Sequence, residues 1–114
     1  MMPIGPATRI YLAAGATDLR KSFEGLSDQV RHQFKEDPLS GHLFVFANRK
    51  RTRIKLLYFD GTGVWVLAKR LKKGRFSWPR GSDKTELPLA PEALALLLGG
   101  VELKHGSLKP WYER

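Results

Sequence analysis

The sequence predicts an α+β fold, a mainly antiparallel β-meander packed against an N-terminal amphipathic helix, with a short C-terminal helix. Two patterns lead to this prediction. Apolar residues recur at spacings of three and four between Leu19 and Phe34, which is typical of one face of a helix. Short apolar runs separated by turn residues then extend from residue 42 to residue 78, which is typical of consecutive strands. The length of 114 residues fits one domain, 1–114.

The N-terminal part is expected to form one strand followed by the amphipathic helix. The strand is predicted at residues 8–13, TRIYLA. The buried face of the helix is then expected to consist of Leu19, Phe23, Leu26, Val30 and Phe34. Thr17 or Asp18 is expected to cap the free N–H groups at its start, and Pro38 and Gly41 to end it.

The rest of the chain is expected to contain four more strands and a short helix. The strands are predicted at 42–47, 53–59, 64–71 and 75–78. DGTG at 60–63 and KKG at 72–74 are turn sequences that join the last three into an antiparallel meander. In PEALALLLGG, Pro91 suits the first position of a helix and Gly99 its end, and the helix between them is apolar nearly all round.

The DGTG turn predicts how the two strands beside it pair. A two-residue turn places Phe59 opposite Val64 and Arg53 opposite Arg70. The opposite pairing of two cations is unfavourable by a few tenths to about 1 kcal/mol, which a bound phosphate would relieve.

A second turn at Lys73 and Gly74 would place Lys69 opposite Trp78, where its ammonium would lie over the indole ring. One face of the meander is then expected to be core, formed by Ile54, Leu56, Tyr58, Trp65, Leu67, Leu71, Phe76 and Trp78. The other face is expected to be apolar near the DGTG turn and basic at its far end.

The net charge of +9 is concentrated in the middle of the chain. Residues 49–84 hold twelve basic and two acidic side chains, whereas the segments on either side are close to neutral. Alternate loops of a meander emerge at the same sheet edge, so the loops 48–53 and 72–74 are expected to share one. A basic surface of this kind is typical of proteins that bind a polyanion. The candidate nucleic-acid contacts are Arg49, Lys50, Arg51, Arg53, Lys55, Lys69, Arg70, Lys72, Lys73, Arg75 and Arg80.

Three further residues are weaker candidates for the same partner. Arg20 and Lys21 would lie in the first turn of the helix, where cations oppose the helix dipole unless a phosphate binds there. Trp78 would stack a base. The alternatives are that Arg20 and Lys21 are simply solvated and that Trp78 belongs to the core.

The sequence offers no recognisable catalytic or metal site. There is no cysteine, and His32, His42 and His105 lie far apart without a metal-binding motif. Serine-nucleophile and phosphate-binding glycine motifs are also absent. We therefore expect no catalytic residue, no metal and no cofactor. No stretch approaches the ~20 apolar residues of a membrane span and no signal peptide is evident, so a cytoplasmic protein without a membrane partner is expected.

Several motifs resemble one family of mobile-element proteins. The segments RIYLAAGATDLRKSFEGL at 9–26 and DPLSGHLFVFANRKRTRIKLLYFDGTGVWVLAKRLKKGRFSWP at 37–79 are similar to the small accessory protein (TnpB, the second open reading frame product) of insertion sequence 66 elements. The similarity covers about residues 4–98 and leaves the tail, about 100–114, outside. Where many relatives carry tryptophan before DG and glutamate after KRL, this chain has Phe59 and Lys72.

The resemblance implies a bacterial protein that acts in transposition beside a separate transposase, which holds the catalytic residues. Together with the charge, it predicts a non-enzymatic accessory protein whose partners are DNA, that transposase and, for specific site choice, further copies of itself. The alternative is an adaptor whose basic edge binds the transposase without touching DNA.

Overall fold

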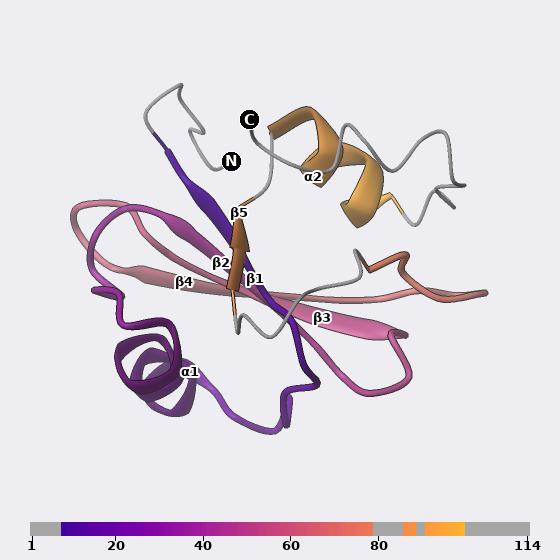
Figure 1. Ribbon diagram of the computed structural model, residues 1–114, viewed down its shortest axis with the longest axis horizontal. Coiled ribbons are helices and arrows are strands. Elements are labelled where there is room, and N and C mark those ends of the chain that lie inside the picture. Colours follow the sequence, from indigo (N-terminus) through magenta and orange to yellow (C-terminus); the bar gives the residue numbers. More distant parts are fainter. Residues whose placement is uncertain (1–7, 79–85, 89–90, 100–114) are drawn as a thin grey trace.

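The computed structural model describes residues 8–78, 86–88 and 91–99 (Figure 1). The elements in chain order are β1 (Ile10–Ala13), α1 (Phe23–Gln29), the π-helix η1 (Val30–Phe34), β2 (Leu43–Ala47), β3 (Arg53–Phe59), β4 (Val64–Arg70), β5 (Glu86–Pro88) and α2 (Pro91–Leu98). The strands form a single sheet in the order β4-β3-β2-β1-β5. In Figure 1, α1 lies on one side of this sheet and α2 on the other. The predicted α+β class is confirmed.

Strands β2, β3 and β4 form the predicted antiparallel meander. The register set by the DGTG turn is also as predicted, with Phe59 opposite Val64 and Arg53 opposite Arg70. β1 lies parallel to β2, because α1 and η1 carry the chain back across the sheet between them. β5 pairs antiparallel with β1 and was not expected from the sequence. Its three residues are too few to show an alternating pattern.

The core consists of two layers, one on each face of the sheet. The central strand β2 is buried along its whole length, with alternate side chains in the two layers. The layer facing α2 contains Ile10, Leu12, Leu43, Val45, Ala47, Ile54, Leu56, Tyr58, Phe76, Leu94 and Leu97. The layer facing α1 contains Tyr11, Ala13, Leu26, Val30, Phe34, Phe44, Phe46 and Leu57.

The helix begins later than predicted. α1 starts at Phe23 with Ser22 in the N-cap position, so neither Thr17 nor Asp18 caps it. The Asp18 carboxylate instead accepts hydrogen bonds from the backbone and side chain of Arg20. The chain from Thr17 to Lys21 is not helical, so the helix starts at Phe23. Phe23 was predicted to be buried, but it is 43% exposed.

The helix ends in a π-helical turn, which keeps its apolar side chains over the sheet. Leu26, Val30 and Phe34 are all buried and follow one another at intervals of four. An α-helix has 3.6 residues per turn, so each such interval drifts ~40° around the axis. The wider turn of η1 offsets this drift. Lys35 is the C-cap of η1. It has a φ of 59° and donates its backbone N–H to the Val30 carbonyl.

The prediction of a strand at 75–78 was wrong. The backbone N–H of Phe76 donates to the Arg51 carbonyl (2.6 Å), so this segment crosses the loop before β3 and does not extend the meander. Lys69 therefore does not lie opposite Trp78. Phe76 is buried as expected, and Trp78 packs against the same core layer.

Trp65 is the exception on the predicted core face. It is 51% exposed near the DGTG turn, where the Asp60 carboxylate accepts its indole N–H at 2.8 Å. The same carboxylate accepts N–H bonds from Thr62 (2.8 Å) and Gly63 (2.9 Å). Hydrogen bonds from the Thr62 backbone, from Trp65 and from the rest of the turn hold the pKa of Asp60 well below its usual range.

Within residues 8–78, 86–88 and 91–99, no helix has the length and apolar character needed to cross a bilayer.

We expect Phe34→Ala to lower the free energy of unfolding by about 3–5 kcal/mol, as measured by denaturant titration. Phe34 is 2% exposed and packs between the rings of Phe44 and Phe46, each 5.7 Å away between ring centroids. Phe23→Ala is the matched control, and we expect a loss below about 1 kcal/mol because its ring is exposed. Equal losses would contradict the exposed position of Phe23 at the start of α1.

We expect Asp60→Asn to destabilise the protein near neutral pH and to have little effect in strong acid. A carboxylate whose pKa is depressed by folding contributes stability above its unfolded pKa of about 4, and this contribution is lost as the pH falls toward the folded value. Denaturant titrations of both proteins between pH 6 and pH 2 measure the difference. A difference that stays constant over this range would argue against ionisation of Asp60 as its cause.

Candidate nucleic-acid interface

Two basic loops meet at one end of the meander, as the sequence predicted. The first joins β2 to β3 and the second follows β4. The Thr52 carbonyl accepts the backbone N–H of Leu71 at 3.0 Å, and the Arg51 carbonyl accepts that of Phe76. These hydrogen bonds hold residues 48–53 beside residues 71–76. We call the surface formed by the two segments the basic end.

The first loop is organised by the side chain of Asn48. Its Oδ1 accepts the backbone N–H groups of Thr52 (3.0 Å) and Arg53 (3.1 Å), and its Nδ2 donates to Thr52 Oγ1. The backbone carbonyl of Asn48 also accepts the N–H of Arg51. Asn48 therefore holds the loop backbone in a closed turn, and the neighbouring basic side chains project from this turn.

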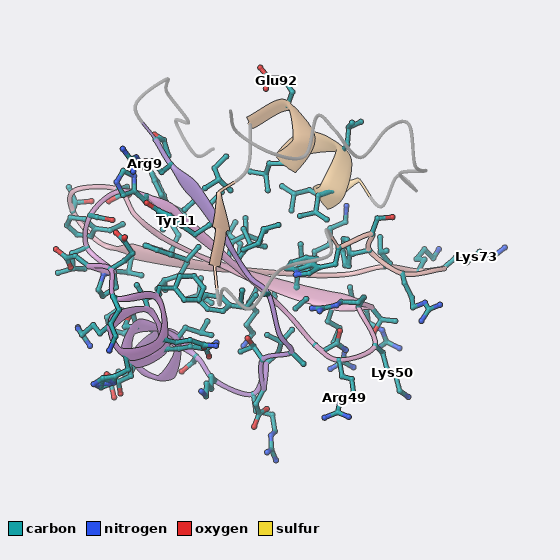
Figure 2. All side chains as sticks on the ribbon, viewed as in Figure 1. Arg9, Tyr11, Arg49, Lys50, Lys73 and Glu92 are labelled. Carbon is teal, nitrogen blue, oxygen red and sulfur yellow. The ribbon has the colours of Figure 1, made fainter. Side chains whose placement is uncertain are left out.

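Six cations of the basic end are exposed. Figure 2 shows Arg49 and Lys50 extending away from the sheet, with Lys73 extending from the neighbouring loop. In the part of the chain that the structure describes, the ion pairs are Asp18–Arg20 and Asp28–Arg31, so none involves a cation of this surface. The exposed cations are Arg49, Lys50, Arg53, Lys72, Lys73 and Arg75.

Arg51 differs from its neighbours because it points inward. Its backbone has a φ of 59°, and its guanidinium lies 4.9 Å from the centroid of the Trp78 ring. Nη2 donates to the Ala14 carbonyl, and burial lowers the pKa of the guanidinium. Trp78 in turn donates its indole N–H to the Ala13 carbonyl at 2.9 Å. Arg51 and Trp78 thus join the loop to the end of β1, and the guanidinium covers a face of the indole that was a candidate for stacking a base.

A hollow of about 390 Å³ continues the basic end onto the face covered by α1. Its cationic wall includes Arg53 and Arg70, which lie directly opposite each other on β3 and β4. Lys55 also lines it and donates its ammonium to the Lys21 carbonyl at 2.9 Å. The apolar part of its lining comes from Leu19, Ile54 and Ala68. The lining of the hollow is therefore part cationic and part apolar.

Lys69 also lines the hollow and is exposed, but its ammonium is bonded to another element. The ammonium of Lys69 donates to the Leu98 carbonyl at the C-terminal end of α2, a favourable position for a cation. Arg80 lies outside the described residues. Whether each candidate contacts nucleic acid remains a prediction. The geometry favours the six exposed cations of the basic end over Arg51, Lys69 and Trp78, whose polar groups are bonded inside the protein.

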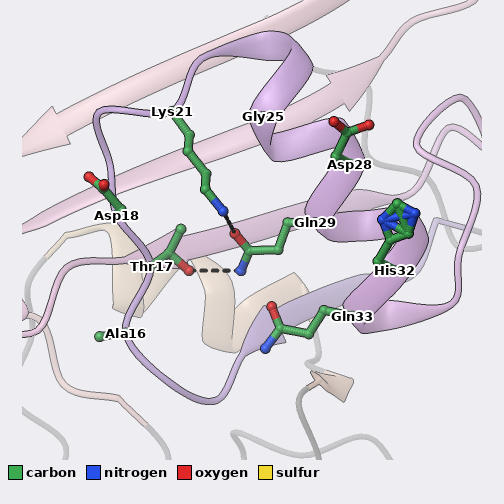
Figure 3. A pocket seen from close by; sticks show the side chains of 9 residues that line it. All are labelled: Ala16, Thr17, Asp18, Lys21, Gly25, Asp28, Gln29, His32 and Gln33. Carbon is green, nitrogen blue, oxygen red and sulfur yellow. Dashed lines mark hydrogen bonds between the residues drawn. The ribbon is translucent and has the colours of Figure 1, made fainter.

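Arg20 and Lys21 precede α1, so the expected cations in its first turn are not there. Arg20 is paired with Asp18, and hydrogen bonds from Arg20 lower the pKa of that carboxyl to about 2. Lys21 points into a second pocket, shown in Figure 3, and donates to Gln29 Oε1 at 3.3 Å. The side-chain Nε2 of Gln29 in turn donates to Thr17 Oγ1. The residues around this pocket are Ala16, Thr17, Asp18, Lys21, Gly25, Asp28, Gln29, His32 and Gln33.

The described residues contain no group of three or more histidine, cysteine, aspartate or glutamate side chains placed to hold a metal ion. His42 has a local role, since its Nδ1 accepts the backbone N–H of Arg9 at 3.0 Å.

Sequence reasoning missed two residues that shape the site. Leu19 was assigned to a helix face, but it lies in the lining of the hollow. Asn48 was treated as one position of a basic run. An asparagine at the start of a turn, followed four residues later by threonine, is the pattern that would have indicated its role.

Comparison with known proteins gives the chain a family. The family model described as IS66 Orf2-like protein matches residues 8–107. Two proteins of Sinorhizobium fredii (strain NBRC 101917 / NGR234) are similar over nearly their full length. The uncharacterized protein y4hO is 37% identical over 105 residues, covering 92% of this chain and 90% of the relative. The uncharacterized protein y4jC is 33% identical over 109 residues, covering 94% and 92%.

No solved structure matches the chain significantly. The family match spans both basic loops, the β-meander and both helices, and it agrees with the resemblance seen in the sequence motifs. The chain therefore belongs to the IS66 Orf2-like family and is a transposition-associated accessory protein.

Proposed function

We propose that this protein binds DNA through its basic end and assists the separate transposase of its element without catalysing a reaction itself. One observation carries the proposal. Backbone hydrogen bonds hold two loops together so that Arg49, Lys50, Lys72, Lys73 and Arg75 are exposed on one surface, with no carboxylate partner among the described residues. Such a surface suits a polyanion.

The fixed shape of the first loop supports binding over simple solvation. Asn48 and Arg51 hold the backbone of this loop through contacts inside the protein. Little backbone entropy would then be lost when Arg49 and Lys50 contact phosphates. A loop that served only to expose charge to water would need no such internal bonding.

The hollow supports the same conclusion for the strand residues. Arg53 and Arg70 face each other as a non-hydrogen-bonded pair, the type in which side chains lie closest. Their repulsion disfavours the free protein. A phosphate bound between them would remove this repulsion.

The molecule measures 38 Å along its longest axis, which corresponds to about one turn of a duplex. Contacts to phosphates supply affinity and orientation but carry no sequence information. We therefore assign the choice of target site to the transposase or to a larger assembly, and affinity for DNA to this chain.

We expect the double variant Arg49→Ala/Lys50→Ala to bind duplex DNA more weakly and with less dependence on salt. If about five phosphates are neutralised, a fourfold rise in salt weakens wild-type binding roughly 500-fold. Removing two contacts reduces that factor to roughly 40-fold. Fluorescence anisotropy with a labelled duplex at several salt concentrations gives both slopes.

The control is Arg9→Ala/Arg31→Ala, which removes the same charge elsewhere. Arg9 lies far from Arg49 and Lys50 in Figure 2, and Arg31 lies on η1 beside Asp28. We expect this control to keep the wild-type salt slope. Equal slopes for the two double variants would show that only net charge matters. Absence of wild-type binding to both duplex and single strands at low salt would overturn the DNA proposal, and capture of purified transposase would then support the adaptor.

We expect Arg70→Gln to change stability and binding in opposite directions. Loss of the repulsion with Arg53 should raise the free energy of unfolding at low salt by roughly a few tenths of a kcal/mol. Loss of a phosphate contact should weaken DNA binding at the same salt. Denaturant titration and anisotropy measure the two quantities. A variant that is less stable yet binds normally would remove Arg70 from the interface.

A further inference from the structure

Among the described residues, no strand pairs with the outer edge of β4. β4 is a terminal strand of the sheet formed by the described strands. The two ends of the β3–β4 ladder show which backbone groups of β4 point toward β3. At one end the backbone N–H of Asp60 donates to the Gly63 carbonyl, and at the other the backbone N–H of Leu71 donates to the Thr52 carbonyl. Bonded and non-bonded pairs alternate between these ends. The N–H and C=O groups of Val64, Val66, Ala68 and Arg70 therefore point away from β3.

We propose that β4 pairs antiparallel with β4 of a second copy of this chain, with Leu67 opposite Leu67 of the second copy on the two-fold axis. In this register all seven residues of the strand are paired. The outward groups of Val66 meet those of Ala68, and those of Val64 meet those of Arg70. About eight intermolecular hydrogen bonds result. A shift by one residue would set outward groups against inward ones and lose these bonds.

The side chains are compatible with this register, in which each cation faces an apolar partner. Trp65 lies opposite Lys69 of the other copy, and Val64 lies opposite Arg70. Trp65 is half-exposed and fixed by its bond to Asp60, so the flat indole is available to cover the aliphatic part of the lysine. Registers centred on Lys69 or Arg70 would instead place like charges opposite each other. A second copy of this chain thus fits the edge.

The two-fold axis of such a pair is perpendicular to the sheet. The faces that α1 covers in the two copies therefore lie on the same side, and so do the two hollows that contain Arg53 and Arg70. Arg70 lies six positions after Val64, which places the two Arg70 residues about 20 Å apart along the strand direction. One duplex could then contact both hollows, and this step alone rests on the proposed function. The strand pairing itself does not require DNA.

The test uses the absence of native cysteine. In a Leu67→Cys variant of the full chain, the two thiols would face each other in a non-hydrogen-bonded pair, whose Cα separation of about 4.5 Å permits a disulfide. We expect mild oxidation to produce a covalent dimer on a non-reducing gel. Lys69→Cys is the matched control on the same face of the same strand. Its two thiols would lie four residues apart along the pair, so little cross-linking is expected.

A second test measures the molecular mass of the protein in solution, after nuclease treatment to remove bound nucleic acid. We expect sedimentation equilibrium to show a concentration-dependent shift from the 12.9 kDa chain to twice that mass. Ala68→Pro removes an outward N–H and leaves the β3 ladder intact, so it should abolish dimerisation with little change in the circular dichroism spectrum. Ala68→Val keeps the N–H and should retain it. A wild-type protein that stays monomeric up to its solubility limit, or equal cross-linking of the two cysteine variants, would overturn the proposal.

Discussion

The structure depends on the burial of β2 on both faces. Every residue from Leu43 to Ala47 is apolar and buried, so the strand requires cover above and below. α1 with η1 supplies one cover and α2 the other. With helices on both faces, charged residues lie on the outer sides of the helices, at the ends of the strands and at the sheet edges. The basic residues of the two loops collect at one such end, where backbone hydrogen bonds hold the loops together.

The cations at that end form no ion pair with an acidic side chain among the described residues. Asn48 bonds to its own loop, and Arg51 turns inward to the indole of Trp78 and the Ala14 carbonyl. Arg51 is thus used to hold the loop, and Arg49 and Lys50 are left exposed. Adjacent residues of one basic run therefore have different physical roles. A preorganised set of cations loses less entropy on binding than a flexible one.

The parts of the fold that depend on local pattern could be predicted from the sequence. The DGTG turn was enough to give the β3–β4 register, because strand pairing beside a short turn is fixed by the turn. Contacts between distant segments could not be predicted. Residues 75–78 alternate like a strand, yet Phe76 bonds to Arg51 instead of continuing the meander. Likewise, Asp18 is a suitable helix cap by type, but its carboxylate is engaged by Arg20.

The same distinction applies to the candidate site. The convergence of the two basic loops follows from the meander and was predicted, whereas the inward turn of Arg51 depends on Trp78 and Ala14, which are distant in sequence. The hollow was not predicted either, because its lining combines Leu19, from before α1, with residues of β3 and β4.

The order of strands in the sheet also has a consequence for how the chain folds. β3 and β4 are joined by a short turn, whereas β1 pairs with β5 across most of the sequence, with Tyr11 opposite Pro88. Closing a long loop costs more entropy than closing a short one, so the β3–β4 hairpin is favoured to form early and the β1–β5 contact late. During synthesis the meander can form before β5 has left the ribosome. The segment that carries most of the positive charge is then expected to fold first, and the outer strand to complete a sheet that already exists.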